Sequence, residues 1–287
     1  MATVKDFRVK EKPTWCPGCG DFAVLSALQK ACANNGLEPE NVALITGIGC
    51  SGKLVQHFGS YGFHTLHGRS LPSAQGVKLG NQDLTVIAAG GDGDGYGIGM
   101  GHLIHSIRRN IDLTYIVMDN HIYGLTTGQM SPTSKKGFKT KTSPQGSTEE
   151  PVRAVETAIA NGISYVAQAF SGDVKHMTKI FQDAIAHKGF ALVNTFSPCV
   201  TFNKVNTYEW FKDNLINLDE EESYDPTDRE KALHIMHEKA GMVYGTIYKN
   251  PRPVFNEEML GASDIAAAKL DLNIPLAEKR ELLATFR

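Results

Sequence analysis

Residues 84–97 read LTVIAAGGDGDGYG, an apolar run that passes directly into a glycine-rich loop. The run Leu84–Ala89 is typical of a buried strand because it is short, apolar and followed by turn residues. Asp92 then stands at the end of that strand. The surrounding glycines let backbone amides approach an anion closely, and the helix expected at Met100–Arg109 adds an N-terminus that favours phosphate. The stretch therefore predicts a strand, an anion-binding loop and a helix in succession.

The same alternation of apolar runs and amphipathic stretches continues on both sides of this loop, which predicts an α/β fold with a mainly parallel sheet flanked by helices. We expect strands at Val42–Thr46, Leu84–Ala89, Leu113–Met118, Ser164–Ala169 and Ala191–Thr195. We expect helices at Phe22–Asn34, Met100–Arg109, Val152–Ala160 and Val174–His187. Asp21 and Asp173 are suitable N-caps for the first and the last of these helices.

The periodic pattern weakens after Pro198. We therefore expect one domain over residues 1–200 and an irregular tail over residues 201–287 that packs on this domain or on a partner. One helix is expected near Asp228–Lys239, and Ala262–Leu283 is weakly helical. Within the domain, the loop Met130–Glu150 is longer than an ordinary connection between a strand and a helix, which favours a binding loop or a lid.

Composition excludes several classes of protein. The 29 Lys and Arg residues balance 31 Asp and Glu residues, and no basic stripe appears, so nucleic acid is not an expected partner. No apolar run approaches the roughly 20 residues that a membrane helix needs. The N-terminal residues lack the apolar core of a signal peptide, so we expect the protein in the cytoplasm.

A second strand, Leu113–Met118, ends in the pair Asp119-Asn120. Because parallel strands open at the same carboxyl edge of a sheet, Asp92 and Asn120 are expected to lie near each other. Both offer hard oxygen ligands to one magnesium ion, which usually takes further oxygens from phosphates. The plainer interpretation is a turn with a capping aspartate, since Asp-Gly turns are common.

A second glycine-rich loop, Gly47-Ile-Gly-Cys-Ser-Gly-Lys53, follows the strand Val42–Thr46. Its spacing matches the dinucleotide fingerprint, but the segment His67–Gln75 lacks the acid that would hold a ribose. It also matches most of a P-loop, although Leu54 stands where a Ser or Thr should bind magnesium. The apolar run ending in Asp119 is similar to a Walker B strand, so a P-loop nucleotide-binding protein remains an alternative.

Four of the five cysteines belong to three separate loops. Cys16 and Cys19 form a C-x-x-C turn, Cys50 lies in the Gly47–Lys53 loop and Cys199 follows a proline. Four thiolates so arranged suit a 4Fe–4S cluster, and from the cysteines alone a structural zinc site is about equally suitable, with a redox C-x-x-C third. Cys32 lies in the middle of the first helix and is expected to be a small core residue.

Taken together, these motifs resemble the beta subunits of 2-oxoacid:ferredoxin oxidoreductases. The resemblance extends from about Trp15 to Val200 and rests on motifs in the same order: WCPGCGDFAVLSAL, GIGCSGK, HTLHGRSLPSAQGVKLGN, GDGDGYGIGMGHLIHSIRRNIDLTYIVMDNHIYGLTTGQMSPTS and SPC. Asp92 followed by Asn120 resembles the thiamine diphosphate motif, in which G-D-G precedes N-N at this distance. Asp119 replaces the first Asn of that pair, whereas the second Asn is the metal ligand.

The resemblance implies a full set of site residues. Magnesium ligands are implied at Asp92, Asn120 and the backbone carbonyl of Ile122. Diphosphate contacts are implied at Gly93, Asp94, Gly124 and Leu125, and further thiamine contacts at Ile48, Gly49, Cys50, Ser51 and His67. The 4Fe–4S ligands would be Cys16, Cys19, Cys50 and Cys199. Lys53 resembles the lysine beside the substrate carboxylate, and the plainer interpretations are a solvated loop lysine at 53 and a capping or core histidine at 67.

The implied reaction is the coenzyme A-dependent oxidative decarboxylation of a 2-oxoacid, with electrons passing to ferredoxin. The stretch Tyr123–Gln129 resembles the 2-oxoglutarate branch, although some broad-range relatives carry a lysine where this chain has Thr127. The family also implies an alpha subunit, in an α2β2 heterotetramer, that supplies the pyrimidine-binding domain. A non-redox thiamine-dependent decarboxylase half-subunit and a zinc-stapled interaction subunit remain alternatives.

Overall fold

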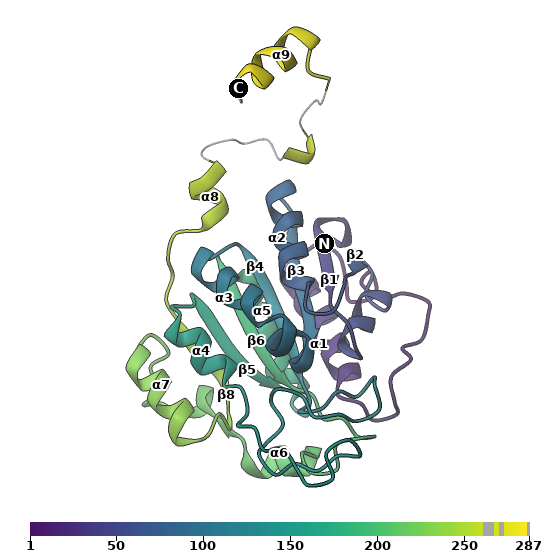
Figure 1. The fold of residues 1–287 in the computed structure, drawn as a ribbon, viewed down its shortest axis with the longest axis vertical. Coiled ribbons are helices and arrows are strands. Elements are labelled where there is room, and N and C mark those ends of the chain that lie inside the picture. The colour runs from purple at the N-terminus through teal and green to yellow at the C-terminus, as the bar shows by residue number, and fades with distance from the viewer. Residues whose placement is uncertain (261–266, 270–272, 286–287) are drawn as a thin grey trace.

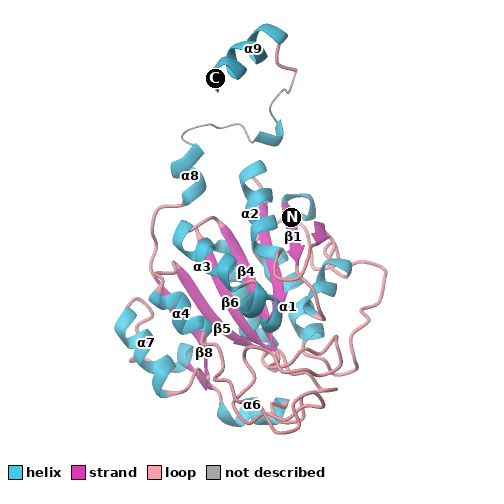
Figure 2. Ribbon diagram, in the orientation of Figure 1, coloured by secondary structure: helices cyan, strands magenta, loops and turns pink. Residues whose placement is uncertain are grey.

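The computed structural model describes residues 1–260, 267–269 and 273–285, and within them an eight-stranded sheet lies between two layers of helices (Figure 1, Figure 2). Six neighbouring strands are parallel, β8 joins β5 antiparallel, and β7 pairs parallel with β8. The order across the sheet is β2 (Tyr61–His64), β1 (Val42–Thr46), β3 (Thr85–Gly91), β4 (Leu113–Asp119), β6 (Phe190–Phe196), β5 (Tyr165–Phe170), β8 (Val243–Lys249) and β7 (Ile216–Asn217).

Helices cover both faces of the sheet, so its central strands are buried throughout. In β4, Tyr115 and Val117 point into the core on one face, whereas Ile116 and Met118 point into the core on the other. The first face carries α2 (Ser70–Gly80), α3 (Met100–Arg109) and α4 (Ala154–Ala160), with α7 (Arg229–Glu238) packed on α4. The second face carries α1 (Asp21–Asn34) and α5 (Val174–Ala186).

The parallel α/β fold is confirmed, and each predicted strand and helix before residue 200 occurs with its ends within two residues of the expected ones. Asp173 is confirmed as an N-cap, since its carboxylate accepts a hydrogen bond from the His176 amide at 3.0 Å. The N-cap prediction for Asp21 is wrong. Gly20 holds that position, and the Asp21 carboxylate instead accepts a hydrogen bond from Ser197 Oγ at 2.7 Å.

The stretch after residue 200 contains more regular structure than its sequence pattern indicated. β8 adds to the main sheet, and its residues Val243 and Ile247 lie in the same core as α4 and α7. The predicted helix near Asp228–Lys239 is confirmed as α7. Short helices occur at α6 (Tyr208–Asn214), α8 (Phe255–Leu260) and α9 (Leu276–Ala284). The helical pattern predicted at Ala262–Leu283 lies partly outside the described residues, and the division of the chain at residue 200 stays a prediction.

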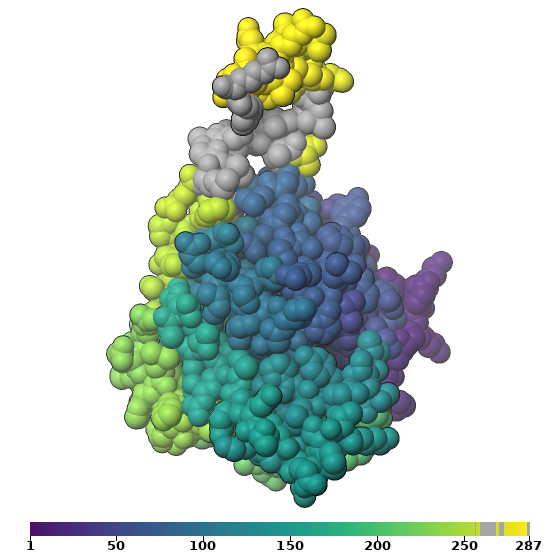
Figure 3. All heavy atoms as spheres, in the orientation of Figure 1, coloured from purple at the N-terminus to yellow at the C-terminus, as the bar shows by residue number. Residues whose placement is uncertain are grey.

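The loops that follow β1, β3, β4 and β6 gather at one end of the sheet, at the bottom of Figure 1. In the space-filling view, the teal-coloured middle of the chain covers this end of the molecule (Figure 3). Ligands of parallel α/β sheets bind at this carboxyl edge, so it is the place to look for a site. No helix in the described ranges has the length and apolar character needed to span a bilayer.

Candidate active site

The loops after β1, β3 and β4 enclose a cavity of about 70 Å³ at the carboxyl edge of the sheet. The structure brings together there each predicted magnesium ligand and each predicted thiamine diphosphate contact. The predicted residues lining the cavity are Ile48, Gly49, Cys50, Ser51, His67, Asp92, Gly93, Asp94, Asn120, Ile122, Gly124 and Leu125. Residues up to 77 positions apart in the chain thus line the same cavity, because neighbouring parallel strands end side by side.

Asp92 lies directly after β3 and is only 2% exposed. Its Oδ2 lies 2.7 Å from Thr133 Oγ1, and the same hydroxyl lies 2.8 Å from Asp119 Oδ1. Burial, together with the negative charge of Asp119, raises the pKa of Asp92 to about 6. Because a hydroxyl has one hydrogen, it can donate to only one of the two carboxylates. When both are ionised, the pair has a negative charge that a bound cation can balance, with His121 Nε2 also 3.8 Å from Asp119 Oδ1.

Asn120 and Ile122 belong to a tight turn after β4. The Ile122 amide donates to Asn120 Oδ1 at 3.1 Å, and His121 between them adopts a left-handed conformation with φ of 57°. Such a conformation is costly for a non-glycine residue and often marks a functional site. The Asn120 carbonyl accepts from Asn203 Nδ2 at 3.0 Å, which fixes the turn against the chain beyond β6.

Asp94 joins the loops of the cavity. Its Oδ1 accepts hydrogen bonds from the amides of Ile48 at 2.9 Å and Gly68 at 2.8 Å, and burial raises its pKa. The carboxylate packs so closely on Gly47 that a β-carbon there would lie 2.0 Å from Asp94 Oδ2. Only glycine fits at position 47, so this residue lets three separate loops close around one carboxylate.

His67 lies at the rim of the same cavity with its side chain 40% exposed, and its Nδ1 is 4.0 Å from Asp94 Oδ1. Its ring centroid lies 6.2 Å from that of Tyr123. Tyr123 donates from its hydroxyl to the Gly93 carbonyl at 3.1 Å. His67 is therefore not a core histidine, since it faces the cavity and the solvent.

The four predicted cluster cysteines line a second cavity of about 210 Å³, together with Lys53 and the indole of Trp15. A β-carbon on Gly124 would lie 3.5 Å from Cys199 Sγ and 3.7 Å from Cys50 Sγ. Burial, the carboxylate of Asp21 and the other thiols raise the pKa of Cys50 to about 11. Among the described residues, no three His, Cys, Asp or Glu side chains meet closely enough to hold a single metal ion. The thiols thus surround a space instead of meeting at one point.

The two cavities share Cys50, Asn120, Gly124 and Leu125 as common walls. Trp15 Nε1 donates to the Cys50 carbonyl at 2.8 Å and so connects the C-x-x-C turn to the Gly47–Lys53 loop. Lys53 is half-buried and lies near Asp21. Burial raises the pKa of Asp21 to about 6, and the positive charge of Lys53 partly opposes this rise. Cys32 is confirmed as a core residue, since it is fully buried beneath β1 and β3.

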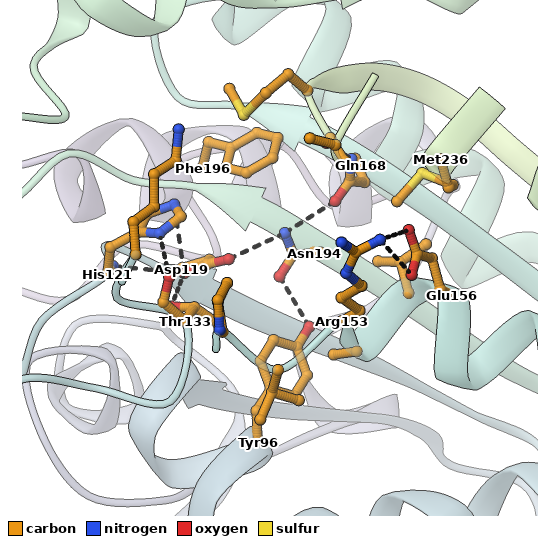
Figure 4. Close-up of a pocket in the computed structure, with 18 of the residues that line it drawn as sticks. Tyr96, Asp119, His121, Thr133, Arg153, Glu156, Gln168, Asn194, Phe196 and Met236 are labelled. Carbon is orange, nitrogen blue, oxygen red and sulfur yellow. Dashed lines mark hydrogen bonds and ion pairs between the residues drawn. The ribbon is translucent and has the colours of Figure 1, made fainter. Parts of the chain in front are cut away.

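A third, larger cavity of about 420 Å³ lies on the other side of Asp119 (Figure 4). Asn194 Nδ2 donates to Asp119 Oδ2 at 3.3 Å and to Gln168 Oε1 at 3.1 Å, and Tyr96 donates its hydroxyl to Asn194 Oδ1 at 2.8 Å. This network holds Asp119 from the side opposite to Thr133. Sequence reasoning missed Thr133 and Tyr123 as site residues. The one available signal was the unusual length of the loop that contains Thr133.

Comparisons with known proteins agree with this geometry. Residues 47–195 match the family model "Thiamine pyrophosphate enzyme, C-terminal TPP binding domain", and residues 199–264 match the model for the C-terminal part of the pyruvate ferredoxin oxidoreductase beta subunit. A 2-oxoacid:ferredoxin oxidoreductase subunit beta from Saccharolobus solfataricus is 48% identical over 215 residues, which are 74% of this chain and 70% of that protein. The 2-oxoglutarate synthase subunit KorB from Archaeoglobus fulgidus is 40% identical over 71% of this chain and 77% of its own length.

A solved structure of 2-oxoglutarate:ferredoxin oxidoreductase from Magnetococcus marinus, with 2-oxoglutarate, coenzyme A and succinyl-CoA bound, superimposes with a TM-score of 0.89. Its sequence identity is 37%, and the match covers 100% of this chain and 96% of the other. Similarity of this extent in sequence and in structure shows the family. The chain therefore belongs to the beta subunits of the 2-oxoacid:ferredoxin oxidoreductases.

Proposed function

We propose that this subunit takes part in the coenzyme A-dependent oxidative decarboxylation of 2-oxoglutarate, with electrons leaving through a 4Fe–4S cluster to ferredoxin in the cytoplasm. The observation that supports this most directly is the shared wall between the Asp92–Asn120 cavity and the four-cysteine cavity. The substrate is inferred from relatives, since KorB of Archaeoglobus fulgidus is a 2-oxoglutarate synthase subunit and the Magnetococcus marinus structure contains 2-oxoglutarate and succinyl-CoA.

Asp92, Asn120 and the Ile122 carbonyl are suited to hold Mg²⁺ with the diphosphate of thiamine diphosphate. The paired carboxylates of Asp92 and Asp119 fit this group, because they share one hydroxyl hydrogen and favour a cation. The helical turn Gly93–Ile98 has no side-chain cap at its start, and the amides at the start of such a turn suit a phosphate. Bound thiamine diphosphate supplies the electron sink for loss of CO2 from a 2-oxoacid.

Cys16, Cys19, Cys50 and Cys199 are suited to hold a 4Fe–4S cluster, since they surround a space large enough for a multi-atom group. Such a cluster carries electrons one at a time. Cys50 belongs to both cavities, so the cluster ligand and the cofactor contact lie in one short loop. Lys53, in the wall of the thiol cavity, provides a cation that offsets part of the negative charge of the thiolates.

Lys53 is our candidate for binding the carboxylate of the substrate. It is half-buried in the wall of the thiol cavity, where water screens its charge less than at the surface. His67 is our candidate for a hydrogen bond to the cofactor at the rim of its cavity, where the ring lies 4.0 Å from Asp94 Oδ1. The alpha subunit of an α2β2 enzyme would complete this site with its pyrimidine-binding domain.

The proposal is tested by co-expressing the chain with its alpha subunit and purifying the complex without oxygen. We expect a brown protein with about four iron atoms per beta chain, extractable thiamine diphosphate, and ferredoxin reduction that requires 2-oxoglutarate and coenzyme A. Pyruvate as the better substrate would overturn the 2-oxoglutarate assignment. A colourless complex that releases CO2 without an electron acceptor would support the non-redox decarboxylase. Stoichiometric zinc without thiamine, or tight ATP binding, would support the interaction subunit or the P-loop protein respectively.

A further inference from the structure

Thr133 connects two buried carboxylates that belong to different strands. Its hydroxyl lies 2.7 Å from Asp92 Oδ2, at the end of β3, and 2.8 Å from Asp119 Oδ1, at the end of β4. All three side chains are buried. Figure 4 shows Thr133 and Asp119 side by side, and both line the large cavity. A residue of the long loop after β4 therefore contacts Asp92, a side chain of the proposed metal site, from the side of the larger cavity.

The backbone around Thr133 is fixed to the turn that carries Asn120. The Thr133 carbonyl lies 2.9 Å from His121 Nδ1, and the neighbouring Ser134 donates its hydroxyl to the His121 carbonyl at 2.7 Å. Ser134 Oγ also accepts from the Ser131 amide at 3.0 Å, and Val152 donates its amide to the Pro132 carbonyl at 2.8 Å. Thr133 thus has a defined position relative to both side-chain ligands that the proposed function assigns to Mg²⁺.

Asp119 adds a second negative charge one hydroxyl away from Asp92. Its other oxygen accepts from Asn194, so the carboxylate cannot turn away from Thr133 without losing that bond. It stands where the thiamine motif has its first Asn, a neutral residue of the same shape. Two carboxylates that share one hydroxyl attract a cation more strongly than one carboxylate and an amide do.

We propose that Thr133 and Asp119 are positioning residues for the metal site: Thr133 holds the Asp92 carboxylate in the orientation that binds Mg²⁺, and Asp119 strengthens the attraction for the cation. This inference rests on the proposed function, because it requires Mg²⁺ at Asp92 and Asn120. Neither residue needs to touch the metal. Groups that orient a metal ligand in this way commonly change metal affinity about 10–100-fold.

The test measures the Mg²⁺ concentration that half-saturates thiamine diphosphate binding by the assembled enzyme, followed by quenching of protein fluorescence at a fixed cofactor concentration. We expect Thr133→Val to raise this concentration about 10-fold or more, and Thr133→Ser, which keeps the hydroxyl, to restore it to within about 2-fold. Asp119→Asn should raise it about 3- to 10-fold, since it removes the charge and keeps the shape. Thr148→Val, in the same loop but exposed, is the matched control and should change nothing.

Thermal unfolding without cofactor and kcat at saturating Mg²⁺ separate positioning from folding. We expect kcat to recover with excess Mg²⁺ in Thr133→Val. A lower unfolding temperature with an unchanged Mg²⁺ requirement would overturn the inference, because Thr133 would then only hold the loop. If the unmodified enzyme binds thiamine diphosphate equally well without divalent cations, the proposed function itself fails at the metal site. If its binding is Mg²⁺-dependent and the variants behave like the unmodified enzyme, only the inference fails.

Discussion

The two edges of the same parallel sheet differ in how their buried polar groups are satisfied. We call the edge where the parallel strands begin the amino edge, and the edge where they end the carboxyl edge. At the amino edge, Asn110 and Lys78 are buried polar residues whose hydrogen bonds are satisfied by the chain itself. At the carboxyl edge, Asp21 Oδ2, Asp94 Oδ2 and His121 Nε2 are buried and have no hydrogen-bond partner within the described residues. The amino edge therefore contributes stability, whereas the carboxyl edge holds polar groups that suit ligands better than they suit the fold.

Asn110 shows how many hydrogen bonds one side chain forms at the amino edge, although Tyr165 Oη and Arg252 Nε there have no partner within the described residues. Its Oδ1 accepts from the Phe190 amide at 2.9 Å and from Ser164 Oγ at 2.6 Å, while its Nδ2 donates to the carbonyls of Arg252 and Pro253. One side chain thus joins the start of β6, the start of β5 and the segment after β8. At the carboxyl edge, Asp92 and Asp119 both lie within hydrogen-bond distance of the Thr133 hydroxyl, which can donate to only one of them. The difference predicts that substitutions at the carboxyl edge weaken ligand binding, whereas substitutions at the amino edge lower the free energy of unfolding.

The largest expected effect is at Cys199. Cys199→Ser in the assembled enzyme should remove most of the iron and the ferredoxin reduction, because a serine is a poor replacement for a thiolate ligand. The free energy of unfolding of the metal-free protein should change little, since Cys199 is only half-buried. Iron analysis and the visible absorption spectrum measure the loss. Cys32→Ser is the matched control and should keep the iron while costing about 1–2 kcal/mol of stability, because Cys32 is in the core.

The next largest effect is expected at Asp92. Asp92→Asn should raise the Mg²⁺ concentration needed for thiamine diphosphate binding about 100-fold, since it removes a charged ligand. Without cofactor the variant should be as stable as the unmodified protein or more so, because one of two neighbouring buried charges is gone. Calorimetry with and without Mg²⁺ and cofactor measures both effects. A cofactor-free variant that unfolds more easily would contradict the view that the carboxyl edge favours ligand binding over stability. Asp213→Asn, at an exposed position, is the control and should leave both measurements unchanged.

Much of the carboxyl edge could be predicted from sequence because parallel topology fixes where strands end. Asp92 and Asn120 each follow an apolar run, and neighbouring parallel strands bring such residues to one edge. Thr133 could not be predicted, since it lies in a loop without periodicity and acts through a contact with a residue 41 positions away. Asp21 was assigned as an N-cap from local sequence, but the distant Ser197 decides where its carboxylate points.

The amino edge left almost no signal in the sequence. Asn110 reads as an ordinary residue after a helix, yet its partners lie at positions 164, 190, 252 and 253. Strand β8 was missed for a related reason. It reaches the sheet only through antiparallel pairing with β5, after a stretch with little periodicity. Local patterns identify strands and their ends, whereas the satisfaction of buried polar groups depends on contacts that only the folded chain defines.

At the amino edge, Asn110→Ala tests stability directly. The substitution leaves buried backbone and hydroxyl groups without partners and places alanine at a φ of 53°, so we expect a loss of about 3 kcal/mol in the free energy of unfolding. Thiamine diphosphate binding should keep its Mg²⁺ dependence. Urea unfolding of the cofactor-free protein measures the loss. Asn161→Ala at the exposed end of α4 is the control, and an equal loss there would remove any special role of Asn110.

The smallest effect is expected at Lys78, and it sharpens the comparison through its pH dependence. Lys78 Nζ lies 3.1 Å from Asp112 Oδ2 and donates to the carbonyls of Gln82 and Leu84. Burial works to raise the pKa of Asp112, but Lys78, the Gly189 amide and Lys188 together hold it below its ordinary value. We expect Lys78→Met to cost about 2 kcal/mol near neutral pH, less than a fully broken buried pair, because Asp112 keeps its other partners.

A carboxylate with a lowered pKa in the folded state stabilises the protein above its unfolded pKa and loses that contribution as the pH falls through its folded value. The stability difference between Lys78→Met and the unmodified protein should therefore shrink below about pH 4, the ordinary pKa of aspartate. Lys188→Met is the matched control, since Lys188 contacts the same carboxylate at 3.3 Å but is 74% exposed and should cost under about 0.5 kcal/mol. Equal costs for the two lysines would show that burial at the amino edge adds nothing, and the contrast with the carboxyl edge would then have no energetic basis.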